Sequence, residues 1–146
     1  MAAFNKFQQF VQDLAEKRHD LSADQLEVYI TNSTPDAAAD GYKADLAELG
    51  GGNGYTAGGI DTQNTGAEAA GTYTLTGTKV VITASGGTIG VFRYVVLFNE
   101  TQAAPTADGL VGWWDYGVGG LTLNDGETFS IKFNNSDTTG TILTIA

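Results

Sequence analysis

The sequence contains no cysteine and a single histidine, His19. The lack of cysteine excludes disulfide bonds and thiolate chemistry, and one histidine is too few for the common imidazole and thiolate metal sites. His19 follows Lys17 and Arg18 near the end of a predicted helix. We therefore expect this cationic segment at a solvated helix terminus, where positive charge complements the helix dipole, and not in a Ser–His–Asp triad.

Basic residues are also scarce: 7 lysines and arginines stand against 17 aspartates and glutamates, for a formal net charge of −10. A nucleic-acid surface needs clustered Lys and Arg, and anionic membranes repel such a chain, so we expect neither partner. The densest apolar run, Tyr94–Phe98, is far too short to span a membrane, and residues 1–10 lack the apolar core of a signal peptide. The sequence predicts a soluble protein made in a cytoplasm.

Glycine, in contrast, is abundant, and six glycines fall among the ten residues of Gly50–Gly59. Such a run disfavours both a helix and a central strand, so it predicts a long, shaped loop with Tyr55 at its crown. A phosphate-binding loop would end in Gly-Lys-Ser/Thr, and nothing basic follows Gly59 directly. Nucleotide binding is therefore not expected.

Residues 3–18 predict an amphipathic helix, because apolar residues recur at three- and four-residue spacing. The stripe consists of Phe4, Phe7, Phe10, Val11 and Leu14. Two interpretations remain open: the helix lies on the core of its own domain, or residues 1–20 form a terminal arm that docks on a partner. Residues 21–146 are expected to form a single β domain.

The rest of the chain predicts strands. Gln25–Asn32 alternates Leu26, Val28 and Ile30 with more polar residues, which indicates one buried face. Gly90–Asn99 is apolar on both faces between Tyr94 and Phe98 and is expected at the centre of a sheet. With further strands from Thr72 to Ala146, the count is seven or eight. The predicted fold class is mainly β: an antiparallel β-sandwich or jelly-roll-like domain with an N-terminal amphipathic helix.

Two groups of side chains invite a chemical role. Trp113 and Trp114 are neighbours in a predicted strand and must face opposite sides, and with Tyr116 they are assigned equally to a core or to a sugar- or protein-binding surface. Oxygen-bearing residues lie in nearby turns, but Asn-Asp-Gly is ordinary hairpin chemistry and does not establish a calcium site; they are Asn124, Asp125, Glu127 and Asp137. No motif predicts a catalytic residue, a metal or a cofactor, so we expect a protein that is not an enzyme.

Three segments carry a family resemblance. Val28–Pro35 reads VYITNSTP, Tyr42–Leu49 reads YKADLAEL, and Gly52–Gly59 reads GNGYTAGG. Together they resemble small structural proteins of tailed bacteriophages, and look like virion proteins of the capsid decoration, or cement, type. The resemblance covers about Leu26 to Ile60. In the C-terminal half the similarity is weaker and is limited to two short segments, GLVGWWD and LNDGETF.

The resemblance implies a non-enzymatic virion structural protein that binds the outer capsid surface and stabilises the lattice of the major capsid protein. It further implies self-association, as a homotrimer, and a location on the virion after synthesis in the host bacterial cytoplasm. The expected contact residues are Phe4, Phe7, Phe10, Val11, Leu14, Asn53, Tyr55, Trp113, Trp114 and Tyr116. Two alternatives stay open: a neck or tail component of the same virion, and a carbohydrate-binding tail-associated module.

Overall fold

A fully buried strand, β8 (Tyr94–Asn99), lies at the centre of the larger sheet. In the computed structural model, which describes residues 2–146, all six residues of this strand are buried. The strands around it are β1 (Phe4–Lys6), β2 (Leu26–Thr31), β3 (Ile60–Asp61) and β9 (Gly109–Asp115). They form an antiparallel sheet in the order β1-β9-β8-β2-β3. The prediction of a central strand that is apolar on both faces is confirmed.

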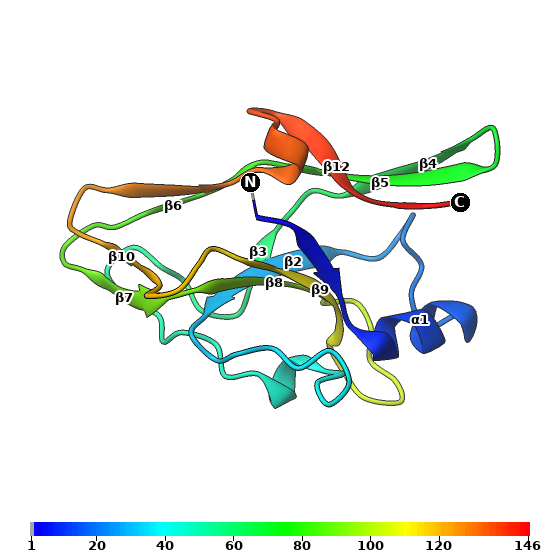
Figure 1. Cartoon of the computed structure of the whole chain (residues 1–146), viewed down its shortest axis with the longest axis horizontal. Coiled ribbons are helices and arrows are strands. Elements are labelled where there is room, and N and C mark those ends of the chain that lie inside the picture. The colour runs from blue at the N-terminus through cyan, green and yellow to red at the C-terminus, as the bar shows by residue number, and fades with distance from the viewer. Residues whose placement is uncertain (1) are drawn as a thin grey trace.

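The remaining strands form three smaller antiparallel sheets. They are β4 (Thr65–Ala69), β5 (Thr72–Thr78), β6 (Val80–Thr83), β7 (Ile89–Phe92), β10 (Leu121–Leu123), β11 (Thr128–Ile131) and β12 (Thr139–Ile145). Their orders are β12-β5-β4, β11-β6 and β10-β7. Figure 1 shows β12, β5 and β4 above the larger sheet, with the ribbons of β6, β7 and β10 extending to the opposite end of the molecule. The predicted mainly β class, with antiparallel sheets and one helix, is confirmed.

The chain from β5 to β12 forms nested antiparallel pairs. β8 pairs with β9, β7 with β10, β6 with β11, and β5 with β12. A single residue, Lys79, separates β5 from β6, and Arg93 likewise separates β7 from β8. The break at Arg93 divides the predicted strand Gly90–Asn99, and residues 2–146 hold twelve short strands where the sequence predicted seven or eight. The chain from β5 to β12 is thus one long hairpin that folds over itself. It contributes strands to the larger sheet and to the three smaller sheets.

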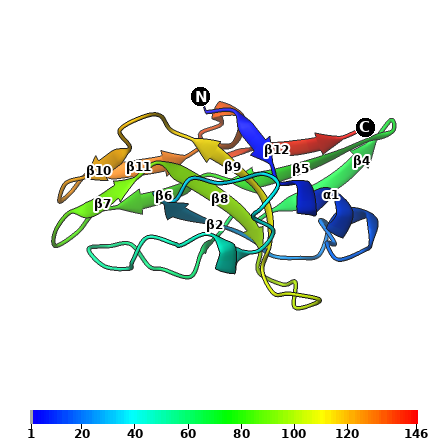
Figure 2. The ribbon, with the colours of Figure 1, turned by 60° about the horizontal axis from the view of Figure 1, so that its bottom comes forward.

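The larger sheet has a core on each face. On one face, Val28, Val95 and Trp114 belong to a cluster that also holds Leu75 and Phe133 from the smaller sheets. The opposite face carries a second cluster of Phe7, Tyr29, Leu46, Val96, Phe98 and Leu110. The larger sheet is therefore a middle layer, covered on one side by other strands and on the other by irregular chain (Figure 2).

The prediction of one buried face for β2 is wrong, because both faces are buried. Tyr29 and Thr31, which were expected to face solvent, have no exposed surface. The segment between β2 and β3 covers them: Leu46 packs in the same cluster, and the hydroxyl of Thr31 donates a hydrogen bond to the carbonyl of Ala47. This segment includes the short 3₁₀ helix η1 (Lys43–Asp45). A second 3₁₀ helix, η2 (Phe133–Asn135), precedes β12.

The predicted helix 3–18 is also wrong at its start. Phe4 pairs with Trp114 in β1, and the helix α1 comprises only Gln8–Ala15. The ring of Phe4 fills the space over Gly112, where an added Cβ would lie 2.3 Å from it. Pairing with a distant strand has therefore overridden the helical spacing of the phenylalanines. α1 ends where Lys17 adopts a φ of 62° and Arg18 N–H donates to the carbonyl of Asp13 at 2.8 Å.

Candidate interaction surface

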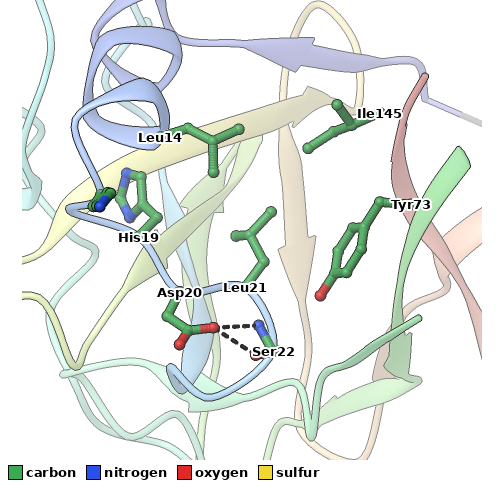
Figure 3. Close-up of a pocket in the computed structure, with 8 residues that line it drawn as sticks. Leu14, His19, Asp20, Leu21, Ser22, Tyr73 and Ile145 are labelled. Carbon is green, nitrogen blue, oxygen red and sulfur yellow. Dashed lines mark hydrogen bonds between the residues drawn. The ribbon is translucent and has the colours of Figure 1, made fainter. Parts of the chain in front are cut away.

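An apolar groove runs between α1 and the C-terminal end of β12. Its cavity measures about 550 Å³ and is lined by Phe4, Lys6, Phe10, Val11, Leu14 and residues 143–146. A second cavity of about 470 Å³ shares Leu14 and Ile145 with it and continues toward His19 and Tyr73. Figure 3 shows Leu14, Leu21, Tyr73 and Ile145 facing this second space from different elements. We call the two connected cavities the α1–β12 groove.

The helix period decides which residues of α1 are available at this groove. Phe10 is buried in the core, whereas Val11, one position further round the helix, is 49% exposed at the rim. Across the groove lies Ile145, the last residue of β12, which pairs with Tyr73 of β5. Its side chain is 38% exposed. Two large apolar side chains thus remain accessible on opposite walls of one hollow.

Two lysines of the groove lack carboxylate partners. Among residues 2–146, ion pairs engage Arg18, Lys43, Arg93 and Lys132, whereas Lys6 and Lys17 form none. Lys6 lines the first cavity and Lys17 the second, and both are exposed. Asp20, a carboxylate in the second cavity, accepts hydrogen bonds from the backbone and hydroxyl of Ser22 (Figure 3). Of the described residues, Lys6 is the one charged side chain that lines the first cavity, whereas in the second cavity Lys17 lies together with the Asp20 carboxylate.

His19 lies beneath the second cavity and not at a solvated helix terminus, so that prediction is wrong. Its side chain has no exposed surface. Asn99 Nδ2 lies 2.9 Å from His19 Nδ1 and 2.6 Å from Asp24 Oδ2. Because the amide nitrogen is the donor in both bonds, Nδ1 accepts and the proton of the neutral ring is assigned to Nε2. Burial lowers the pKa of His19, against the opposing effect of Asp13 and Asp24.

The imidazole of His19 has no nucleophile to activate. Its Nε2 lies 4.0 Å from Asp13 Oδ2, and neither atom has a hydrogen-bond partner among the described residues. The other oxygen of Asp13 accepts hydrogen bonds from Arg18 and Gln9. Ser22, the nearby hydroxyl of the cavity, is bonded to Asp20. The arrangement closes the end of α1 against β8 and does not form a catalytic triad.

The glycine loop packs against the rest of the domain, and Tyr55 is not exposed at its crown. Tyr55 is only 3% exposed, and its hydroxyl donates to Glu48 Oε1 at 2.6 Å and accepts from Ile30 N–H at 3.2 Å. Burial and the neighbouring Glu48 raise the pKa of Tyr55. Asn53 is exposed, but its amide donates to the carbonyl of Thr88 at 2.7 Å. Tyr55 is therefore unavailable as a contact residue, and Asn53 holds the loop against the β6–β7 turn.

The three aromatic residues of the candidate surface are not brought together. Trp113 is half-buried on one face of the larger sheet, 4.5 Å from the ring of Phe7. Trp114 is buried on the opposite face, between Phe4 and Phe133. Tyr116 packs edge-on against Phe129. The prediction that the tryptophans face opposite sides is confirmed, and no shared aromatic platform exists among these three rings.

Of the other predicted contact residues, Phe7 and Phe10 are buried in the chain's own core, whereas Phe4 and Leu14 are half-buried along the groove. The structure thus unites Phe4, Val11 and Leu14 with residues that the sequence did not single out. These are Lys6, Lys17, Leu143 and Ile145. Alternation in Thr141–Ala146 predicts a strand, but it does not reveal that this strand lies at a sheet edge beside α1.

The candidate calcium ligands are engaged elsewhere. Glu127 accepts a hydrogen bond from Asn124 N–H, Asp125 accepts one from Gly86 N–H, and Asp137 pairs with Lys132. Within residues 2–146, no cluster of three or more His, Cys, Asp or Glu residues is placed to hold a metal ion. No helix in that range has both the length and the hydropathy needed to cross a bilayer. Comparison of the chain with protein-family models, curated proteins and solved structures found no match.

Proposed function

We propose that this chain is a non-enzymatic structural protein of a bacteriophage virion, which binds the outer capsid surface and stabilises the lattice of the major capsid protein. The observation that supports it is the α1–β12 groove, an apolar hollow with exposed Val11 and Ile145 and two unpaired lysines at its rim. Such a surface suits attachment to another protein.

The resembling segments contribute to this proposal through the fold. Tyr55 bonds to Ile30 and Glu48, Gly58 N–H donates to Glu48, and Lys43 lies 3.3 Å from Glu48. These hydrogen bonds and this ion pair therefore hold β2, η1 and the glycine loop together. Proteins that share this motif would share these contacts, and their partner contacts would lie elsewhere on the surface. The α1–β12 groove is such a place.

We further infer that the nested strand pairs make the domain jelly-roll-like, because the pairing of a folded-over hairpin is the pattern of that fold. Self-association as a trimer belongs to the same proposal. Several copies attached around one symmetry axis would gain avidity, so that each individual contact needs only modest affinity.

The experiment is size-exclusion chromatography with in-line light scattering, on the purified protein with and without expanded capsids of the same phage. We expect elution with the capsids at a fixed copy number per capsomer. The proposal is overturned if the protein elutes apart from the capsids. A stable six- or twelve-membered ring in isolation would then assign it to the neck or tail. Oligosaccharides that change its tryptophan fluorescence would instead favour the carbohydrate-binding alternative.

Deletion of the first eighteen residues is not a suitable test of the groove. β1 is part of the larger sheet, and Phe7 and Phe10 are buried in the two core clusters. Removing them would expose both cores and unfold the domain. Substitution of Val11, which is half exposed, changes the groove while leaving the core intact.

A further inference from the structure

β12 has a free strand edge beside the groove. β12 is the outermost strand of its sheet and pairs only with β5 among the described strands, with a register shift between Thr141 and Leu143. Its sequence, TGTILTI, has no charged residue and no proline. Proteins protect sheet edges with lysine, proline, β-bulges or a covering segment. Within the described residues β12 has of these only the irregularity near Ile142, so the stretch from Leu143 to Ile145 is a template for another strand.

A second strand edge lies close to it. β1 is the outermost strand of the larger sheet, and it runs near β12 in both Figure 1 and Figure 2. A further cavity of about 440 Å³ separates them, lined by Phe4, Trp114 and residues 141–144. On the other side of Phe4 lies the first cavity of the groove. The two sheets are thus not closed on this side, and the opening is lined by both apolar and polar side chains, including Asn134, Thr141 and Thr144.

We propose that β12 binds an extended strand of another protein by edge addition, with alternate apolar side chains of that strand in the α1–β12 groove and carboxylates near its ends. The inference rests on the proposed function only for the source of the strand, a protein of the capsid surface. Main-chain hydrogen bonds along β12 supply affinity, and the groove selects the side chains.

The size of the site fits a short strand. A strand paired along the seven residues of β12 would be about 23 Å long at a rise of about 3.3 Å per residue. Its side chains beside residues 143–145 of β12 would point toward Val11 and Leu14, which line the cavity of about 550 Å³. That space accepts several residues of the size of valine.

The two lysines beside α1 indicate which groups the ends of the bound strand carry. Lys6 lies two residues before α1 and Lys17 two residues after it, and the eight residues of α1 span about 12 Å. Neither forms an ion pair within residues 2–146, and each lines one of the connected cavities. A strand with a carboxylate near each end complements them. If a second copy of this chain added its own β12 here, that strand would bring no carboxylate to these lysines, because it has no charged residue.

The test uses a fluorescein-labelled peptide of sequence Glu-Val-Thr-Val-Thr-Val-Glu and fluorescence anisotropy. We expect saturable binding that weakens with salt, and weaker binding of the same peptide with lysine at both ends. Val11→Asp should reduce affinity about tenfold or more, since it removes one apolar contact and adds a like charge. Val81→Asp is the matched control, because Val81 is 48% exposed but lies on β6, outside the groove.

Charge reversal gives a second, independent test. The double variant Lys6→Glu/Lys17→Glu should no longer bind the glutamate-ended peptide and should bind the lysine-ended one. Lys79→Glu is the control and should leave the affinity for both peptides unchanged. The inference is overturned if the wild-type protein binds neither peptide, or if Val11→Asp and Val81→Asp behave alike. It is also overturned if the protein self-associates and Val11→Asp abolishes the dimer, which would assign the edge to a second copy. Capsid binding that persists in any of these cases leaves the proposed function standing.

Discussion

Tyr55 of the glycine loop and Glu48 are joined by a hydrogen bond of 2.6 Å, and the same hydroxyl accepts the backbone N–H of Ile30. Glu48 also accepts Gly58 N–H and pairs with Lys43. This one contact therefore ties the loop to β2 and to η1 at once. A glycine-rich loop held in this way is a structural part of the domain.

Tyr55→Phe should lower the free energy of unfolding by about 1–3 kcal/mol, because it leaves the Glu48 carboxylate and the Ile30 amide without their shared partner. Urea denaturation followed by tryptophan fluorescence measures this change. Tyr116→Phe is the control, since the hydroxyl of Tyr116 forms no hydrogen bond with the described residues and its ring is also partly buried. An equal effect of both substitutions would contradict the role of the Tyr55 hydroxyl.

The close approach of Gly54 to the β6 strand gives a second prediction. Gly54 has a φ of 92°, and an added Cβ would lie 2.2 Å from the carbonyl oxygen of Thr83. Gly58 has a φ of 122° but open space around it. Gly58→Ala should therefore cost only backbone strain, about 1–3 kcal/mol, and Gly54→Ala should cost clearly more. Thermal unfolding of the two variants side by side measures the difference, and equal midpoints would refute the close contact.

The buried His19 predicts that stability falls in mildly acidic solution. Because its pKa is lowered from the ordinary 6.5, the unfolded chain binds a proton more readily than the folded one. The contribution is complete above about pH 6.5 and is lost as the pH falls from there toward the folded pKa. The urea midpoint should thus decrease between pH 7.5 and 5.5, and the imidazole signals should titrate below 6.5 in NMR. A titration above 6.5 would contradict the buried neutral ring.

Asp115 is predicted to titrate well below the ordinary aspartate pKa of 3.8. Arg93 Nε and Nη2 donate to its two oxygens at 2.7 and 2.6 Å, and Gly117 N–H donates as well. These hydrogen bonds lower the pKa of Asp115 to about 2. Carboxyl-detected NMR of the wild type should show this value, and Arg93→Gln should move it toward the ordinary 3.8. A wild-type value near 3.8 would mean that the ion pair is not formed in solution.

Several elements were predictable because their signal is local. The run from Tyr94 to Phe98 is apolar at every position, and only a strand covered on both faces accommodates that pattern. Trp113 and Trp114 face opposite sides because successive strand residues always do. The turn at Asn124–Glu127 likewise follows from its own residues, but the hairpin expected there is wrong, because β10 pairs with β7 and β11 with β6.

Other features depend on partners distant in the sequence. The phenylalanine spacing favours a helix from residue 3, but Phe4 belongs to a strand because Gly112 leaves room for its ring. His19 is buried because Asn99, 80 residues away, accommodates its ring nitrogen. The groove was recognisable only in part: Val11 belonged to the predicted stripe, whereas Ile145 meets it only after β12 packs beside α1.

The most direct measurement is co-sedimentation of expanded capsids with the wild-type protein, Val11→Asp and Val81→Asp, each shown beforehand to unfold at the same urea midpoint. We predict that the wild type and Val81→Asp sediment with the capsids at one fixed copy number per capsomer, and that Val11→Asp stays in the supernatant. Sedimentation of all three proteins alike would contradict attachment through the α1–β12 groove. Failure of the wild type to sediment would contradict the capsid-binding function itself.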